Sequence, residues 1–408
     1  MELSEPGRRG EPVAPQELST RDERVAAELP TRRISPPSHG QQSMHNSRPE
    51  SEQNILYLHL HLQILFVFHG FFTTGVAGAD TAWVVDCERE MDGRMGRTED
   101  RAMYVLVSSP SYLAAGVDET FHQPDGPLSL DPSSTVFHYA QCLFEGLKAY
   151  RDANGKVTLF RPDMNMKRMN KSAQRIALPT FDGDALLELL KQLVRLDKHW
   201  IPQELGHSLY IRPVLIGTQN TIGITPPDSA LLYVICSPVG PYYPNGFKPV
   251  ALHGTTEHVR ASPGGAQVGT MNLFVVFKHE DGTVELVTPP LDGMILPGVT
   301  RDSVLALARD HATGKVRLPE LSDKLVVSER GVTMKEVKAA AQAGRLVELF
   351  GTGTAAVISP VDKVGYEGED VIIPVEADGM GPVSRPLWKE LVGRQMGTIP
   401  SEWSVVVD

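Results

Sequence analysis

Cysteine is scarce in this sequence, and lysine is missing from long parts of it. Only three of the 408 residues are cysteines, Cys87, Cys142 and Cys236. An odd and sparse set does not form a disulfide framework and suits a reducing compartment, and without a CxxC motif it indicates no redox or zinc site. We therefore expect three ordinary thiols and no bound metal.

An excess of positive charge and a long uninterrupted apolar run are also absent. The 39 basic and 50 acidic residues give a formal net charge of −11, whereas nucleic-acid binding needs a basic face. Residues 55–68 form an apolar run interrupted by His59, His61 and Gln63, and a membrane-spanning helix needs roughly 20 apolar residues. We expect neither a nucleic-acid partner nor a membrane span.

Residues 1–125 differ in composition from the rest. Lysine first occurs at Lys148, although eleven arginines precede it. Residues 1–54 are rich in Pro, Ser, Glu and Arg and have too few large apolar side chains to offset the entropy of ordering. Residues 55–79 are weakly similar to a signal peptide, but we interpret them as translated non-coding sequence. We predict a largely disordered, atypical extension over residues 1–125.

The remaining residues alternate between strand and helix patterns, which indicates an α+β fold. Asn154 and Gly155 suit a two-residue hairpin in which both adopt positive φ. Residues 237–243 contain too much proline and glycine for a regular element. Thr333 and Glu336 form a capping box. The expected helices span residues 163–175, 185–196, 301–311 and 333–344, and the expected strands span residues 156–160, 208–216, 230–236, 273–278, 283–287 and 347–356, the last running into a glycine turn.

Three stretches have the features that grip a phosphate group, which are a helix start, hydroxyls and an arginine. Residues 296–300 run into the helix expected from Arg301. Residues 351–354 read Gly-Thr-Gly-Thr, and Arg168 lies on the first expected helix. Each stretch alone is weak evidence, because a Gly-Thr-Gly sequence is usually only a turn. The three together are a stronger signal because they occur in the order found in a known family.

Two blocks carry a resemblance to a known family. Residues 137–151 read Phe-His-Tyr-Ala-Gln-Cys-Leu-Phe-Glu-Gly-Leu-Lys-Ala-Tyr-Arg, and residues 268–272 read Val-Gly-Thr-Met-Asn. From Gly126 to Asp408 the chain resembles the branched-chain amino acid aminotransferases. D-amino-acid aminotransferases and aminodeoxychorismate lyases share that fold, but these two blocks are similar to the branched-chain group specifically.

The resemblance implies a two-domain aminotransferase of fold type IV, the fold of D-amino acid aminotransferase. A small N-terminal domain is expected at residues 126–236, a linker at 237–247 and a larger cofactor-binding domain at 248–408. The resemblance also implies pyridoxal 5'-phosphate (PLP) as cofactor and transfer of the amino group between Leu, Ile or Val and 2-oxoglutarate. A homodimer in the cytoplasm or in mitochondria is expected on the same ground.

Site residues are carried over from the family's motifs, and none of them is a metal ligand. The residues implied to bind the cofactor are Arg168, Gln267, Val299, Thr300 and Thr354. The residues implied to bind the amino acid or 2-oxo acid substrates are Tyr139, Phe144, Tyr210, Arg212, Thr270 and Ala355.

The resemblance breaks near residues 265–267, where part of the second domain is missing. In family sequences, the segments that match residues 259–265 and 268–272 of this chain are separated by several tens of residues. That segment carries a tyrosine and the lysine that holds PLP as an internal aldimine and moves the substrate proton. No lysine occurs here between Lys248 and Lys278. We do not expect either of these to substitute, because the geometry tolerates little displacement.

Gln267 stands where the family has a glutamate that pairs with the protonated pyridine nitrogen. A neutral amide holds that proton less well, which weakens the electron sink. Two explanations fit the gap. Either the segment is lost from this sequence through an exon-assignment error and the protein is an active transaminase, or the chain is a degenerate, inactive copy or a binding partner of an active relative.

Overall fold

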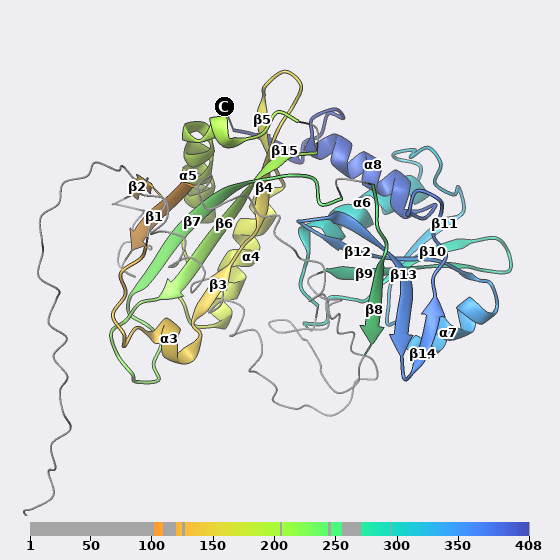
Figure 1. Cartoon of the computed structure of the whole chain (residues 1–408), viewed down its shortest axis with the longest axis horizontal. Coiled ribbons are helices and arrows are strands. Elements are labelled where there is room, and N and C mark those ends of the chain that lie inside the picture. The colour runs from red at the N-terminus through yellow and green to blue at the C-terminus, as the bar shows by residue number, and fades with distance from the viewer. Residues whose placement is uncertain are drawn as a thin grey trace, which may run out of the picture. The chain divides into compact units, whose positions relative to one another are not determined.

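The structure is a computed structural model (Figure 1), and it describes seven stretches of the chain. These are residues 102–108, 120–124, 127–204, 206–243, 246–254, 271–293 and 295–407, the first two by their backbone alone. All of them fall within one compact unit, Glu50–Asp408. The extension at 1–54 and the apolar run at 55–79 lie outside the described residues. Of the helices in these stretches, none is long and apolar enough to cross a membrane.

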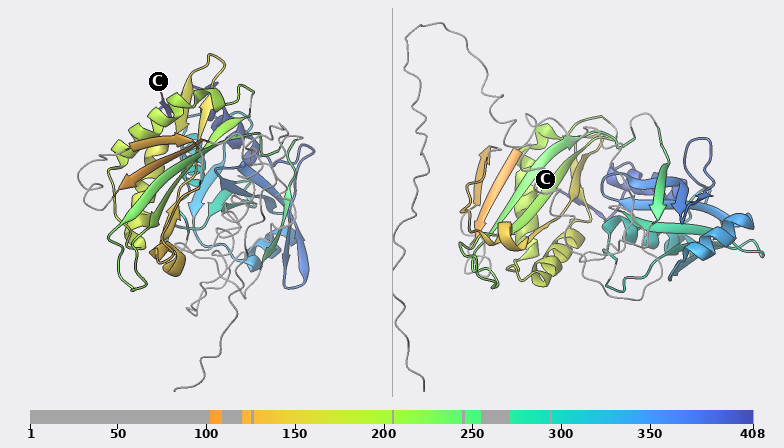
Figure 2. Two further views of the ribbon diagram at one scale, coloured as in Figure 1. Left: turned by 60° about the vertical axis from the view of Figure 1, so that its left-hand side comes forward. Right: turned by 60° about the horizontal axis from the view of Figure 1, so that its bottom comes forward.

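The first sheet has the strand order β15-β5-β4-β6-β7-β1-β2, with β3 paired to β6. Helices α4 (Pro162–Arg175) and α5 (Gly183–Leu196) pack on one of its faces through a core that includes Met169, Leu190 and Leu209 (Figures 1 and 2). The strands are β1 (Ala102–Ser108), β2 (Thr120–Pro124), β3 (Cys142–Phe144), β4 (Leu147–Arg151), β5 (Val157–Phe160), β6 (Ser208–Gly217), β7 (Ala230–Val239) and β15 (Ser404–Val406).

This sheet draws on sequence outside the range expected for the small domain. Strand β1 pairs with β7 along its whole length, from Ala102 opposite Cys236 to Ser108 opposite Ala230. Both β1 and β2 therefore come from the segment interpreted above as an extension. Strand β15, near the C-terminus, also joins this sheet by pairing with β5.

The second sheet has the order β11-β10-β9-β12-β13-β14, with β8 paired to β13. Helices α6 (Val299–Ala312) and α8 (Ser384–Gln395) share one core with this sheet, and α7 (Met334–Gln342) packs into a separate core with it. The strands are β8 (Val250–Gly254), β9 (Asn272–Lys278), β10 (Val284–Thr288), β11 (Leu325–Glu329), β12 (Leu346–Gly353), β13 (Val357–Tyr366) and β14 (Glu369–Ile372).

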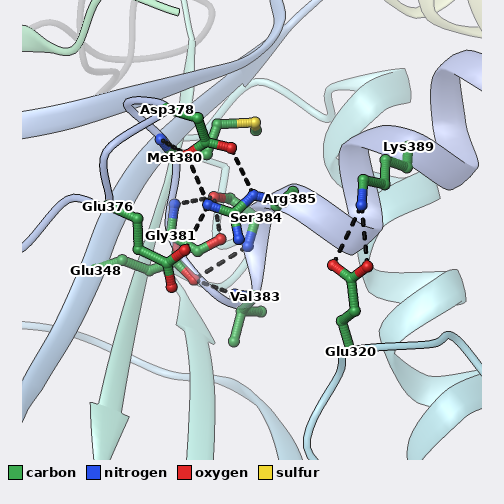
Figure 3. Close-up of polar contacts among 10 residues, drawn as sticks. All are labelled: Glu320, Glu348, Glu376, Asp378, Met380, Gly381, Val383, Ser384, Arg385 and Lys389. Atoms are coloured by element: carbon green, nitrogen blue, oxygen red, sulfur yellow. Dashed lines mark hydrogen bonds and ion pairs between the residues drawn. The ribbon is translucent and has the colours of Figure 1, made fainter.

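A buried carboxylate on β12 fixes the start of α8. Figure 3 shows that Glu348 accepts from the backbone N–H groups of Val383 and Ser384, at 2.6 and 3.0 Å. Burial raises the pKa of Glu348 to about 7, although these hydrogen bonds act in the opposite direction. A Cβ at Gly381 would overlap the Glu348 carboxylate. The α8 start and β12 are therefore held together by a titratable contact.

Most expected helices and strands are confirmed, and local details differ at four places. The hairpin at β4–β5 is confirmed, but only Gly155 has positive φ, at 82°. Residues 237–239 continue β7 instead of opening a linker. Residues 351–353 belong to strand β12, so the tight turn lies at 354–356. Thr333 accepts from the Glu336 N–H at 3.2 Å, whereas the Glu336 carboxylate pairs with Arg330.

Candidate cofactor and substrate site

Arg168 on α4 is the charged centre of the candidate phosphate site. Its Nε and Nη2 donate to Glu145 Oε1 and Oε2, both at 2.7 Å, and its Nη1 donates to the Pro297 carbonyl at 3.1 Å. Burial disfavours the charged form, but Glu145 outweighs that effect and raises the pKa of Arg168. A guanidinium has five N–H donors. Three are used here, so two remain for a ligand.

The start of α6 lies beside Arg168, because Pro297 directly precedes the N-cap residue Gly298. No side chain caps this helix, and its first intrahelical bond runs from the Asp302 N–H to the Gly298 carbonyl at 3.0 Å. The N–H groups of Val299, Thr300 and Arg301 therefore have no intrahelical acceptor. Such a set of N–H groups at the positive end of a helix binds anions.

Asn272, the first residue of β9, shapes the loop before α6. Its Nδ2 donates to the Leu296 carbonyl at 2.9 Å, and a Cβ at Gly298 would overlap its Oδ1. Glycine is therefore required at this N-cap by close approach. Asn272, the last residue of the 268–272 block, thus holds the start of α6 in place. The same helix start is the one predicted to contact a phosphate.

The turn at 354–356 brings the second sheet to β4. Thr354 Oγ1 donates to the Gly146 carbonyl at 3.4 Å, and Lys148 Nζ donates to the Ala355 carbonyl at 2.9 Å. On β12, just before this turn, the hydroxyl of Thr352 is buried and has no hydrogen-bond partner in the described part of the chain. Residues 145–148 thus meet both the α6 start, through Arg168, and this turn.

Phe144, Tyr210 and Arg212 form the candidate substrate cluster on β3 and β6. The Arg212 guanidinium carbon lies 4.4 Å from the Phe144 ring centroid and 5.1 Å from that of Tyr210. Arg212 Nη2 donates to Tyr210 Oη at 2.8 Å, while its Nε is buried without a partner among the described residues. Tyr210 also abuts Gly146, where a Cβ would overlap its hydroxyl. The cluster combines an apolar ring with an unused cationic donor.

The structure does not bring every predicted residue to this region. Tyr139, on the short helix α3 (Thr135–Tyr139), donates its hydroxyl to the Ile222 carbonyl, and among the described residues no hydrogen bond or ring contact joins it to Arg212 or Phe144. Gln267 and Thr270 lie outside the described residues. The side chains of Lys248 and Lys278 are exposed to solvent.

Three residues that matter at the site were not singled out in the sequence. Glu145 is 3% exposed and also accepts from Asn165 Nδ2 at 2.8 Å. Lys148 and Asn272 make the contacts described above. Lys148 lies on β4 between the buried residues Leu147 and Ala149, and Glu145 lies just before that strand. Charged residues beside buried apolar ones are the signal that points to them. Among the described residues, no group of His, Cys, Asp and Glu has the arrangement of a metal site.

Comparisons with known proteins identify relatives of this chain. No protein-family model matches the chain. The branched-chain-amino-acid aminotransferase of Dictyostelium discoideum is 44% identical over 319 aligned positions, which cover 69% of this chain and 82% of that protein. The cytosolic branched-chain-amino-acid aminotransferase of Saccharomyces cerevisiae is 46% identical over 326 positions, covering 70% and 85%. The chain belongs to the branched-chain amino acid aminotransferase family.

Solved structures show the same fold. The Escherichia coli branched-chain aminotransferase superposes with a TM-score of 0.54 at 21% sequence identity, covering 75% of this chain and all of that one. The T.th. branched-chain aminotransferase, complexed with N-(5'-phosphopyridoxyl)-L-glutamate, gives 0.53 at 21% identity, covering 75% of this chain and 98% of that one. The expected fold type IV is thereby confirmed. The family uses PLP, and its relatives here are named as cytosolic or mitochondrial.

The alignment lengths show that this chain is shorter than its relatives over the matched region. In the Dictyostelium comparison, 69% of 408 residues is about 282 residues, fewer than the 319 aligned positions. Some positions of the relative therefore have no counterpart in this chain. The same holds for the yeast cytosolic relative, where 70% of 408 is about 286 against 326 positions.

Proposed function

We propose that this protein is a branched-chain amino acid transaminase that exchanges the amino group of Leu, Ile or Val with 2-oxoglutarate, and that its activity requires a segment absent between Gly264 and Gln267. The observation that carries the proposal is the 44–46% identity to two branched-chain aminotransferases. The meeting of Arg168, the α6 start and the 354–356 turn supports it. By the resemblance, the protein works as a homodimer in the cytosol or in mitochondria.

The retained residues fit the phosphate group of PLP. The two remaining N–H donors of Arg168 and the N–H groups of Val299 and Thr300 would hold the phosphate oxygens, and the Thr354 hydroxyl lies on the facing turn. The buried, unpaired hydroxyl of Thr352 supports the fit, because such a donor is costly without a ligand. When bound, PLP supplies an electron sink for the substrate's α-carbon. Gln267 would contact the pyridine nitrogen more weakly than a glutamate does.

The substrate cluster fits both partners of the exchange. The Phe144 ring is 43% exposed and offers an apolar surface to a branched side chain. The Arg212 guanidinium offers a positive charge to the second carboxylate of glutamate or 2-oxoglutarate. Tyr210 orients Arg212 through its hydroxyl. By the resemblance, backbone groups of Thr270 and Ala355 would meet the shared α-carboxylate, and Tyr139 would line the side-chain pocket with Phe144.

The absent segment would supply the lysine that bonds PLP and moves the α-proton. The alignments leave some positions of the relatives without a counterpart in this chain, as the loss of this segment requires. Reading the transcript across residues 264–267 shows whether the natural messenger encodes the segment. An uninterrupted junction in every transcript would favour the inactive alternative.

Activity is tested with two proteins that differ only in this interval. One is the chain as written, and the other carries the corresponding segment of the yeast cytosolic relative inserted between Gly264 and Gln267. We expect leucine-dependent conversion of 2-oxoglutarate to glutamate by the second protein and a rate lower by at least about a thousandfold for the first. A folded, inserted protein without transaminase activity would overturn the proposal.

A further inference from the structure

Lys148 occupies an unusual position for a lysine. It lies on β4, two residues after Gly146, and its Nζ donates to the backbone carbonyl of Ala355 at 2.9 Å. It forms no ion pair with a carboxylate in the described stretches. Its single polar partner belongs to the turn at 354–356, whose Thr354 also contacts Gly146.

Four exposed or half-buried lysines in the described residues have a different environment. Lys315, Lys338, Lys363 and Lys389 each pair with an aspartate or glutamate at 3.0–3.2 Å. Those carboxylates favour the ammonium form. Lys148 has no such partner, and burial lowers its pKa to about 8. Near that pH about half of its side chains carry a free amine, which is the nucleophilic form of lysine.

We propose that Lys148 is a carbonyl-reactive amine of this site, which condenses with the aldehyde of PLP or the oxo group of a 2-oxo acid. The inference rests on the proposed function, because that function brings a carbonyl compound to the site. The lone pair of the neutral amine forms a bond to the carbonyl carbon. The carbonyl oxygen then leaves as water with the two protons of that amine, and a carbon–nitrogen double bond remains. No atom is oxidised or reduced.

The surroundings of Lys148 favour this reaction. Glu145 and Gly146, just before it, touch the Arg168 site and the Thr354 hydroxyl. A ligand whose phosphate binds at Arg168 and the α6 start would therefore be held near the same short piece of chain. The Ala355 carbonyl orients the amine and is only a neutral acceptor, so it can release the amine without leaving a buried charge unpaired.

The test uses the full chain as written. Separate samples are incubated with PLP and with 4-methyl-2-oxopentanoate, treated with borohydride to reduce any imine, and mapped by peptide mass. Each carbonyl compound adds a different mass, so the two samples distinguish the sources. We expect labelling of Lys148 to exceed that of the exposed Lys156 by about tenfold or more with at least one compound. The substitution Lys148→Arg, which keeps the charge, should abolish that label, and Lys156→Arg should leave it unchanged.

The possible results separate this inference from the proposed function. Tight PLP binding without preferential labelling of Lys148 by either compound overturns the inference and leaves the phosphate site standing. Equal labelling of Lys148 and Lys156 also overturns it. Preferential labelling of Lys148 by 4-methyl-2-oxopentanoate without PLP binding supports Lys148 as the reactive amine. The same result contradicts the proposed phosphate site. Thermal unfolding of each variant verifies that lost labelling does not follow from lost folding.

Discussion

Arg168 and Glu145 form a two-point ion pair, in which Nε and Nη2 of the guanidinium each lie 2.7 Å from a carboxylate oxygen. Glu145 is almost fully buried. The pair holds the guanidinium plane in one orientation, but it also offsets the positive charge of Arg168. A bound phosphate would therefore depend on the α6 N–H groups as well as on this arginine.

The orientation of Arg168 makes a lysine a poor replacement. In Arg168→Lys the ammonium keeps the charge but loses the paired geometry toward Glu145 and the bond to Pro297. We expect PLP affinity to fall by about tenfold or more, measured by fluorescence titration. Arg175→Lys, at the exposed end of the same helix, is the control and should bind normally. If Arg168→Lys binds PLP as tightly as the unsubstituted protein, Arg168 does not contact the phosphate group.

The N-cap of α6 has no space for a side chain. In Gly298→Ala the added Cβ meets Asn272 Oδ1, so either the helix start or Asn272 must move. We expect PLP affinity to fall by about tenfold or more because the N–H groups are displaced. Gly331→Ala is the control, since a Cβ there meets nothing within 4 Å. Equal affinities of the two variants would show that the α6 start does not bind the ligand.

The Glu348 contact gives a pH dependence of stability. The pKa rises from 4.5 to about 7 on folding. Below pH 4.5 both states hold the proton. Between pH 4.5 and about 7 the unfolded state releases it and the folded state keeps it, so the free energy of unfolding falls as pH rises. We expect a fall on the order of 1–3 kcal/mol across this window.

Denaturant unfolding at several pH values tests this dependence. Glu348→Gln keeps an acceptor for Val383 and Ser384 but does not titrate, so its stability should lack that fall. Glu320→Gln is the control, because Glu320 is exposed and pairs with Lys389 at 3.1 Å. The account of Glu348 is wrong if the pH profiles of wild type and Glu348→Gln run parallel from pH 4.5 to 7.

We expect Arg212 to contribute to the binding of dicarboxylate substrates but not to that of monocarboxylate substrates. In Arg212→Met the cationic donor is lost while Phe144 and Tyr210 remain. We expect affinity for 2-oxoglutarate to fall by about tenfold or more, because its second carboxylate loses a charged partner. Affinity for the monocarboxylate 4-methyl-2-oxopentanoate should change little, which is an internal control. A parallel loss for both ligands, measured by calorimetry, would assign Arg212 to the shared carboxylate.

The sequence predicts the parts of the fold that depend on local pattern. The apolar stripe of α5 and the glycine turns of the hairpins are examples of such local patterns. Patterns of this kind predict the helices and most of the strands. The pairing of β1 with β7 is a contact between residues 102–108 and 230–236. The sequence does not predict this pairing. The absence of lysine before Lys148 suggests a different origin for the N-terminal part, but composition carries no information about which strands pair.

The sequence likewise predicts some residues of the candidate site and misses others. Arg168, Val299 and Thr300 are predicted because their types and order match a family motif. Glu145 and Lys148 lie in one of the same blocks, but their roles depend on partners more than 20 residues away, at Arg168 and Ala355. The pKa of Lys148 depends on how much water its neighbours exclude, which no local pattern encodes. Gln267 and Thr270 stay predictions.

The central claim is that this chain retains a phosphate-binding cofactor site although it lacks the family's lysine. Parallel titrations of the chain as written with PLP and with pyridoxal, which has the same ring and aldehyde but no phosphate, test it directly. The account predicts that PLP binds at least about tenfold more tightly than pyridoxal. Equal affinity for the two compounds, or no binding of PLP to the folded chain, would contradict it.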